Sequence, residues 1–291
     1  MLLAPDNAVK QLIRSLSPSW LASLNLQYEH SDIGTVLKRS LHEGPLRVQK
    51  ALYPEGEEIC HTVILHPPAG IAGGDRLDIK VSLGAASHVV LSTPSATKWY
   101  KSFKNPAAQE IEFDLAQDAK LDWLPQENLF FKGADAKILT KLNLQSSSSF
   151  IGWDAAMLGR HASGEEWSKG RVHMRNQIYR DGKLLWIENG QIDAEDRHFK
   201  SLPQIGSWPV FATLWAVGPA CSSALAESIS PMMPWTDALR AGVTYLPQGV
   251  LLVRALSNDI EMTRNWMIDM WSTLRPLVHG VPAQPLRLWA S

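Results

Sequence analysis

The chain has 291 residues, of which 45% are apolar and 20% charged, so it can bury a large core and is neither disordered nor fibrous. Its 28 basic and 29 acidic residues give a net charge of −1, which excludes the basic surface of a nucleic-acid-binding protein. No window reaches the ~20 uncharged apolar residues of a membrane span. The distant Cys60 and Cys221 indicate neither a disulfide framework nor a zinc knuckle, and we expect a cytoplasmic protein.

Residues 1–24 are predicted to form a variable N-terminal extension, with a short amphipathic turn within 9–16. Residues 25–291 are predicted to form one domain, because no linker, charge block or change of composition divides them.

The most unusual segment, residues 66–75, reads HPPAGIAGGD. Pro67 and Pro68 fix φ and remove two backbone donors, whereas glycine accepts positive φ. We expect positive φ at Gly73 and Gly74. A tight crossover in a β protein and a loop that presents a functional group are both open interpretations.

A period of two in side-chain character predicts half-buried strands in three segments, residues 77–83, 111–115 and 138–144. The dipeptide Asp181-Gly182 predicts a two-residue turn between strands over 177–180 and 183–187. Turn signals recur between short strands without alternating helices. The pattern therefore predicts a mainly β fold with many short strands, β-helix-like or built from stacked sheets, and few helices.

One helix is predicted near the C-terminus. Asn258 and Glu261 match a capping box, apolar residues follow at helical spacing, and Pro276 is expected to end the helix after Arg275. The Met and Trp side chains of this helix are predicted to pack in the core rather than hold a metal or cofactor. A second helix is an open interpretation for residues 220–240.

Common catalytic motifs are missing from the sequence, including G-x-x-x-x-G-K-[ST], G-x-S-x-G and H-E-x-x-H. A β-rich glycosidase stays an alternative, since its chemistry needs only two carboxylates at a set separation. The 12 Trp residues are scattered, which favours core packing for most of them. Among Cys60, His61 and His66, at most two side chains converge from an extended strand, which disfavours a stable metal site and leaves a transient one open.

Several motifs, in order, resemble the UreD family of urease accessory proteins, called UreH in some species. They lie at residues 44–50, 53–56, 60–61, 66–75, 93–100, 124–127, 153–154, 159–160, 164–165 and 274–289. Ala69 stands where the family more often has glycine, a departure that concerns only the local backbone.

The resemblance implies a non-enzymatic maturation factor. Such a protein is a scaffold or chaperone that binds the urease apoprotein and recruits UreF and, through it, the GTPase UreG for nickel insertion. It also implies a helix-poor β fold with an internal passage, no tightly bound cofactor, transient nickel, and neither a nucleic acid nor a membrane as partner. A β-rich hydrolase, which would turn over substrate alone, is the alternative.

On this basis we predict Asp75, Asp154 and Glu188 as carboxylates of the passage, with Thr97 supplying a hydroxyl. Glu188 is expected to close the second strand of the hairpin, and capping of a turn is an equal alternative for Asp75. A further set is predicted to shape loops or meet partners: His66, Pro67, Pro68, Gly70, Gly73, Gly74, Lys98, Gln126, Glu127, Gly159 and Arg160.

Overall fold

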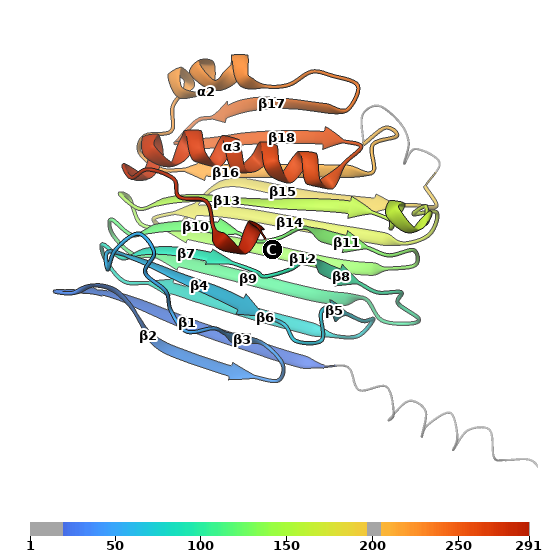
Figure 1. Ribbon diagram of the computed structural model, residues 1–291, viewed down its shortest axis with the longest axis horizontal. Helices are drawn as coiled ribbons and strands as arrows, with labels where there is room; N and C mark the ends of the chain where they lie inside the picture. The colour runs from blue at the N-terminus through green and yellow to red at the C-terminus, as the bar shows by residue number, and fades with distance from the viewer. Residues whose placement is uncertain (1–19, 197–204, 291) are drawn as a thin grey trace, which may run out of the picture.

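The computed structural model describes residues 20–196 and 205–290, whose strands form one sheet of seven and one of eleven strands (Figure 1). The first sheet contains, in spatial order, β15 (Lys183–Asp193), β14 (Arg171–Arg180), β12 (Asp135–Leu144), β9 (Ala107–Leu115), β6 (Arg76–Leu83), β1 (Leu21–Ser31) and β2 (Gly34–Glu43). The main path of the second contains β17 (Leu239–Leu246), β18 (Val250–Ser257), β16 (Val210–Val217), β13 (Ser149–Leu158), β10 (Lys120–Leu124), β7 (His88–Ser92), β4 (Ile59–Leu65) and β3 (Arg47–Val48). Three short strands complete it: β5 (Gly70–Ile71), β8 (Thr97–Trp99) and β11 (Asn128–Phe130).

The chain coils between the two sheets. Strands β6, β9, β12 and β14 are parallel neighbours in the first sheet, and β7, β10 and β13 are parallel neighbours in the second. Successive coils therefore stack like those of a β-solenoid. The predicted mainly β, β-helix-like fold is confirmed, and so are the three strands predicted from alternation.

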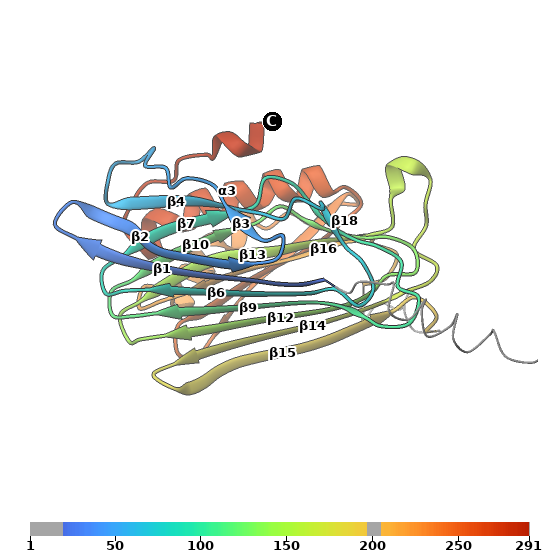
Figure 2. The ribbon, with the colours of Figure 1, turned by 90° about the horizontal axis from the view of Figure 1, so that it is seen from below.

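Two apolar cores hold the layers together, one on each face of the eleven-stranded sheet. Figure 2 shows this sheet between the seven-stranded sheet and helix α3 (Ile260–His279). Residues such as Phe150 and Trp215 face the seven-stranded sheet, whereas Trp153 and Leu214 belong to the core under α3. The other described helices are α2 (Ser223–Ile229) and the short 3₁₀ segments η1 (His161–Ser163), η2 (Ser230–Met232) and η3 (Arg287–Ala290). Neither α2 nor α3 combines the length and the apolar character that crossing a membrane requires.

The predicted hairpin is confirmed, because β14 and β15 are antiparallel and Asp181 and Gly182 have φ of 48° and 75°. The expectation that Glu188 closes the second strand is wrong. Pairing with β14 continues to Asp193, so Glu188 lies in the middle of β15.

The C-terminal helix is confirmed, but both of its predicted ends are wrong. Asp259, not Asn258, is the N-cap, and its carboxylate accepts a bond from the Met262 N–H at 2.7 Å. The Asn258 amide instead donates to the Asp237 carbonyl. The helix continues through Pro276 to His279, because buried contacts on both sides of the proline outweigh one lost backbone bond. Gly280, with a φ of 73°, is the C-cap.

The loop at residues 66–75 follows a stiff path, but its positive φ angles lie at Ala69 (59°) and Gly74 (97°). The prediction for Gly74 is confirmed and that for Gly73 is wrong. Gly73 is needed for space instead, since a Cβ there would lie 2.8 Å from the Asn105 carbonyl oxygen. Ala69 completes the turn after the two prolines, with its N–H bonded to the His66 carbonyl.

Strand β1 begins at Leu21 and pairs with β6, which places residues 21–24 within the first sheet. The turn predicted within residues 9–16 lies outside the described residues. The division of the chain at residue 24 stays a prediction.

Candidate functional site

A cavity of about 270 Å³ lies beside the proline-rich loop. Six of the predicted residues contribute to its lining, and these are His66, Pro67, Gly70, Thr97, Gln126 and Asp154. Burial lowers the pKa of His66, against the attraction of Asp75, so its imidazole favours the neutral form. The fold therefore brings the loop, β8 and β13 together around one space.

A second cavity, of about 170 Å³, lies between the two sheets. Asp154 lines both cavities, and Glu188 lines the second one. Asp154 is on β13 and Glu188 is on β15, so the two carboxylates come from opposite sheets. Three predicted passage residues, Thr97, Asp154 and Glu188, thus follow one another along two adjoining cavities.

Asp154 is the least compensated charge of this site. The residue is 8% exposed, and its Oδ2 atom has no hydrogen-bond partner in the described part of the chain. Burial, together with the negative charge of Glu188, raises the pKa of Asp154 to about 7. A cation that enters here gains a carboxylate oxygen, Asp154 Oδ2, that no donor of the described residues satisfies.

Glu188 differs from Asp154 because it has a cationic partner. Its Oε1 atom accepts a bond from the Arg254 guanidinium at 2.5 Å. The Glu188 side chain is 33% exposed, so this carboxylate lies nearer to solvent than Asp154 does.

Asn176 and Thr213 also line the second cavity, and the sequence analysis missed them. Asn176 pairs with Glu188 across β14 and β15, and its buried Oδ1 atom also lacks a hydrogen-bond partner within the described residues. Thr213 pairs with Asp154 across β16 and β13. A signal was present in both strands, since Asn176 occupies an inward-facing position of the alternating strand β14 and Thr213 is the one polar residue of β16.

Asp75 lines neither of these two cavities. Its Oδ2 atom accepts a bond from the Ala72 N–H and its Oδ1 atom one from the Trp20 N–H, both at 2.9 Å. The geometry supports the turn-capping alternative for this residue.

Gln126 and Glu127 fix the segment that follows β10 to helix α3. The Arg264 guanidinium donates to Gln126 Oε1 at 3.2 Å and lies 3.5 Å from Glu127 Oε2. Lys98 lies within the short strand β8 and pairs there with Gly70 of β5.

Gly159 and Arg160 shape the loop that leaves β13. Gly159 has a φ of 86°, and a Cβ there would lie 2.6 Å from the Glu165 carbonyl oxygen. The Arg160 guanidinium donates to Glu165 and lies over the Phe131 ring. Both residues therefore have structural partners within their own region.

The residues considered for a transient metal site occupy separate environments. Cys60 is fully buried in the core between the sheets, and His61 Nε2 lies 2.7 Å from Glu55 Oε1. His66 lies beyond the end of β4 and lines the first cavity.

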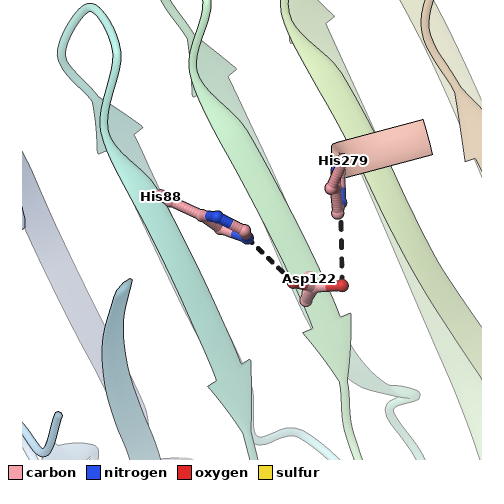
Figure 3. Close-up of side chains that lie close together, drawn as sticks. All are labelled: His88, Asp122 and His279. Carbon is pink, nitrogen blue, oxygen red and sulfur yellow. Dashed lines mark hydrogen bonds and ion pairs between the residues drawn. The ribbon is translucent and has the colours of Figure 1, made fainter. Parts of the chain in front are cut away.

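A second group of polar side chains is buried under α3 (Figure 3). Asp122 of β10 is its centre: Oδ2 lies 3.1 Å from His88 Nε2 and accepts a bond from Arg275 Nε at 3.1 Å, and Oδ1 accepts one from Trp271 at 2.7 Å. His279 lies 3.6 Å from Oδ1. Burial alone would raise the pKa of Asp122, but the His279 and His88 rings and the Arg275 guanidinium lower it.

The network around Asp122 extends to Glu55, Lys120 and Ser149. The Arg275 guanidinium also binds both oxygens of the Glu55 carboxylate, at 2.6 and 3.0 Å. The Lys120 ammonium donates to the carbonyl of His279, the last residue of α3, at 2.7 Å. Burial lowers the pKa of His279 to about 3, so its ring is neutral, and Nδ1 lies 2.7 Å from the Ser149 hydroxyl.

The ligand atoms of His88, Asp122 and His279 lie within 4.8 Å of one another, a spacing that suits a metal ion. Their surroundings do not. Both Asp122 oxygens already accept hydrogen bonds, and Arg275 and Lys120 would repel a divalent cation. We assign this group a structural role, because its hydrogen bonds and ion pairs join α3 to the sheet, and we call it the clasp.

Comparison with known proteins agrees with the motifs. A family model described as UreD urease accessory protein matches residues 21–290. A urease accessory protein UreD from Polynucleobacter asymbioticus is 74% identical over the whole of both chains. The UreD proteins of Cupriavidus pinatubonensis and Bordetella pertussis are 49% and 42% identical, over 95% and 94% of this chain and 96% and 98% of their own.

Proposed function

Because this chain belongs to the UreD family of urease accessory proteins, which implies a role in urease maturation, we propose that it carries nickel through its interior toward the urease active site. The observation that supports this most is the continuity of Thr97, Asp154 and Glu188 along two cavities that share Asp154. Asp75, which caps a turn, is left out of the proposed path.

The donor atoms of the path suit a cargo ion. Hydroxyl, amide and carboxylate oxygens bind divalent cations, and a site with few anionic ligands releases its ion more readily than a closed His and Cys cage. The unsatisfied oxygens of Asp154 and Asn176 supply such ligands in the second cavity. Nickel is therefore held briefly and passed on.

The same proposal makes the chain a cytoplasmic scaffold rather than an enzyme. It binds the urease apoprotein and UreF, and UreF brings the GTPase UreG. The sequence contains no phosphate-binding G-x-x-x-x-G-K-[ST] motif, which fits the supply of GTP hydrolysis by a partner.

The test is a double variant, Asp154→Asn with Glu188→Gln, expressed with urease and the other accessory proteins. Amides keep the size of both side chains but remove the charges that attract a divalent cation. We expect normal pull-down of UreF, UreG and urease, with nickel per active site reduced by about tenfold or more. Metal content is measured by mass spectrometry of the purified urease.

A matched control, Asp114→Asn with Glu110→Gln, removes two carboxylates from β9 that lie outside the two cavities. It should leave the nickel content unchanged. Full nickel occupancy in the cavity variant contradicts the passage, and loss of the complex reassigns Asp154 and Glu188 to an interface. Substrate turnover by the isolated chain would favour the β-rich hydrolase instead.

A further inference from the structure

Two short rows of polar residues lie on the two sheets, and all of them except Arg254 line the second cavity. On the eleven-stranded sheet, Asp154, Thr213 and Arg254 lie side by side on β13, β16 and β18. On the seven-stranded sheet, Asn176 and Glu188 lie side by side on β14 and β15. The bond from Arg254 to Glu188 joins the two rows.

Exposure increases along this set of charges. The Asp154 residue is 8% exposed, and the side chains of Glu188 and Arg254 are 33% and 52% exposed. The guanidinium thus approaches from the solvent side and bonds to the outer carboxylate. The inner oxygens, Asp154 Oδ2 and Asn176 Oδ1, keep no partner within the described residues.

We propose that Arg254 is the resident cation at the edge of the second cavity, where it binds the lining residue Glu188, and that an incoming divalent metal ion displaces its guanidinium from Glu188. The inference rests on the proposed function and adds a competitor to it. A bare divalent ion is smaller than a guanidinium and carries twice its charge, so it can contact the inner oxygens together with Glu188.

Displacement is feasible because the ion pair is half exposed. Such pairs contribute little to stability, since water solvates both partners when they separate. The displaced guanidinium can turn into solvent and return when the ion moves on. Competition by Arg254 therefore weakens metal binding at Glu188 and favours release over trapping.

The test is binding of Ni²⁺ to the purified full-length chain by equilibrium dialysis. Arg254→Gln and Arg254→Met both remove the competing charge, and we expect each to lower the Kd for Ni²⁺ by about fivefold or more. Arg254→Lys keeps a cation and should bind Ni²⁺ nearly as the parent does. The control is Arg171→Gln, because Arg171 is also 52% exposed but pairs with Asp193, which does not line the second cavity as Glu188 does.

Unchanged or weaker Ni²⁺ binding in both uncharged variants overturns the proposed role of Arg254. If these variants also have a lower melting temperature, the role of Arg254 is to stabilise the contact between the two sheets. The Asp154→Asn, Glu188→Gln variant separates this failure from failure of the passage. If that variant loses Ni²⁺ binding while Arg254→Gln binds as the parent, the passage stands without the competitor. If all variants bind as the parent does, both proposals fail.

Discussion

Asp122 and Asp154 are buried carboxylates on neighbouring strands of one sheet, yet their pKa values shift in opposite directions. Asp122 faces α3 and is hydrogen-bonded to Trp271 and Arg275 of that helix and to His88 of β7. Asp154 faces the other sheet, where Glu188 adds a second negative charge. Burial is common to both, so the partners decide whether the charge is stabilised.

The contrast extends to the two regions around these residues. Under α3 the carboxylates Glu55 and Asp122 meet Arg275, and the chain gains a fixed helix. Beside the cavities the described residues include a carboxylate with one unsatisfied oxygen, an unsatisfied amide oxygen and an alanine at positive φ. Such features reduce stability and are typical of functional sites. Substitutions in the two regions should therefore change the free energy of unfolding in opposite directions.

The largest effect is expected for Asp122→Asn. It leaves Arg275 without the charge of its inner partner and sets an amide N–H against donors, which should lower the free energy of unfolding by about 3–5 kcal/mol. Urea unfolding measures this. Asp114→Asn, at an exposed position, should stay within about 0.5 kcal/mol of the parent. A small effect at Asp122 would mean that the clasp does not hold α3.

Asp154→Asn should stabilise the protein, and increasingly so as the pH rises from about 4 to 7. In the folded chain Asp154 keeps its proton up to a pKa of about 7, but in the unfolded chain it loses it near 3.8. Its contribution to stability is thus present below pH 3.8 and is lost as the pH rises through 7. The amide of the Asp154→Asn variant does not ionise, so the stability of the variant does not fall in this way as the pH rises.

We therefore expect the unfolding free energy of Asp154→Asn, relative to the parent, to rise between pH 4 and 7 by at most about 4 kcal/mol. Urea titrations at several pH values measure the difference, and any constant cost of the amide cancels between them. A difference that is independent of pH would show that Asp154 is compensated after all.

The smallest effect is expected for Ala69→Gly. Ala69 has a φ of 59°, where a Cβ is strained, so glycine should stabilise the loop by up to about 1 kcal/mol despite the greater entropy of its unfolded chain. Ala108→Gly, in strand β9, is the control and should be destabilising. Thermal unfolding distinguishes the two, and destabilisation by both would show that Ala69 carries no strain.

The sequence by itself determined the local structure. Alternation identified the strands and their inward faces, Asp181-Gly182 identified the hairpin, and helical spacing identified α3, because these signals depend on neighbours a few residues away. Thr97 and Asp154 were chosen from the family motifs and Glu188 from the predicted hairpin, and all three lie along the cavities. The end of α3 was misplaced because tertiary contacts overrode the local signal of Pro276.

Tertiary structure alone decided which side chains meet. A period of two gives the face of a strand but not its partner, and parallel coils place residues from different turns of the chain side by side. Asp122 and Arg275 are 153 positions apart in sequence, and Arg254 and Glu188 are 66 apart. Whether a buried aspartate became a clasp or a site for a cation therefore depended on the strands and helix that the fold packed against it.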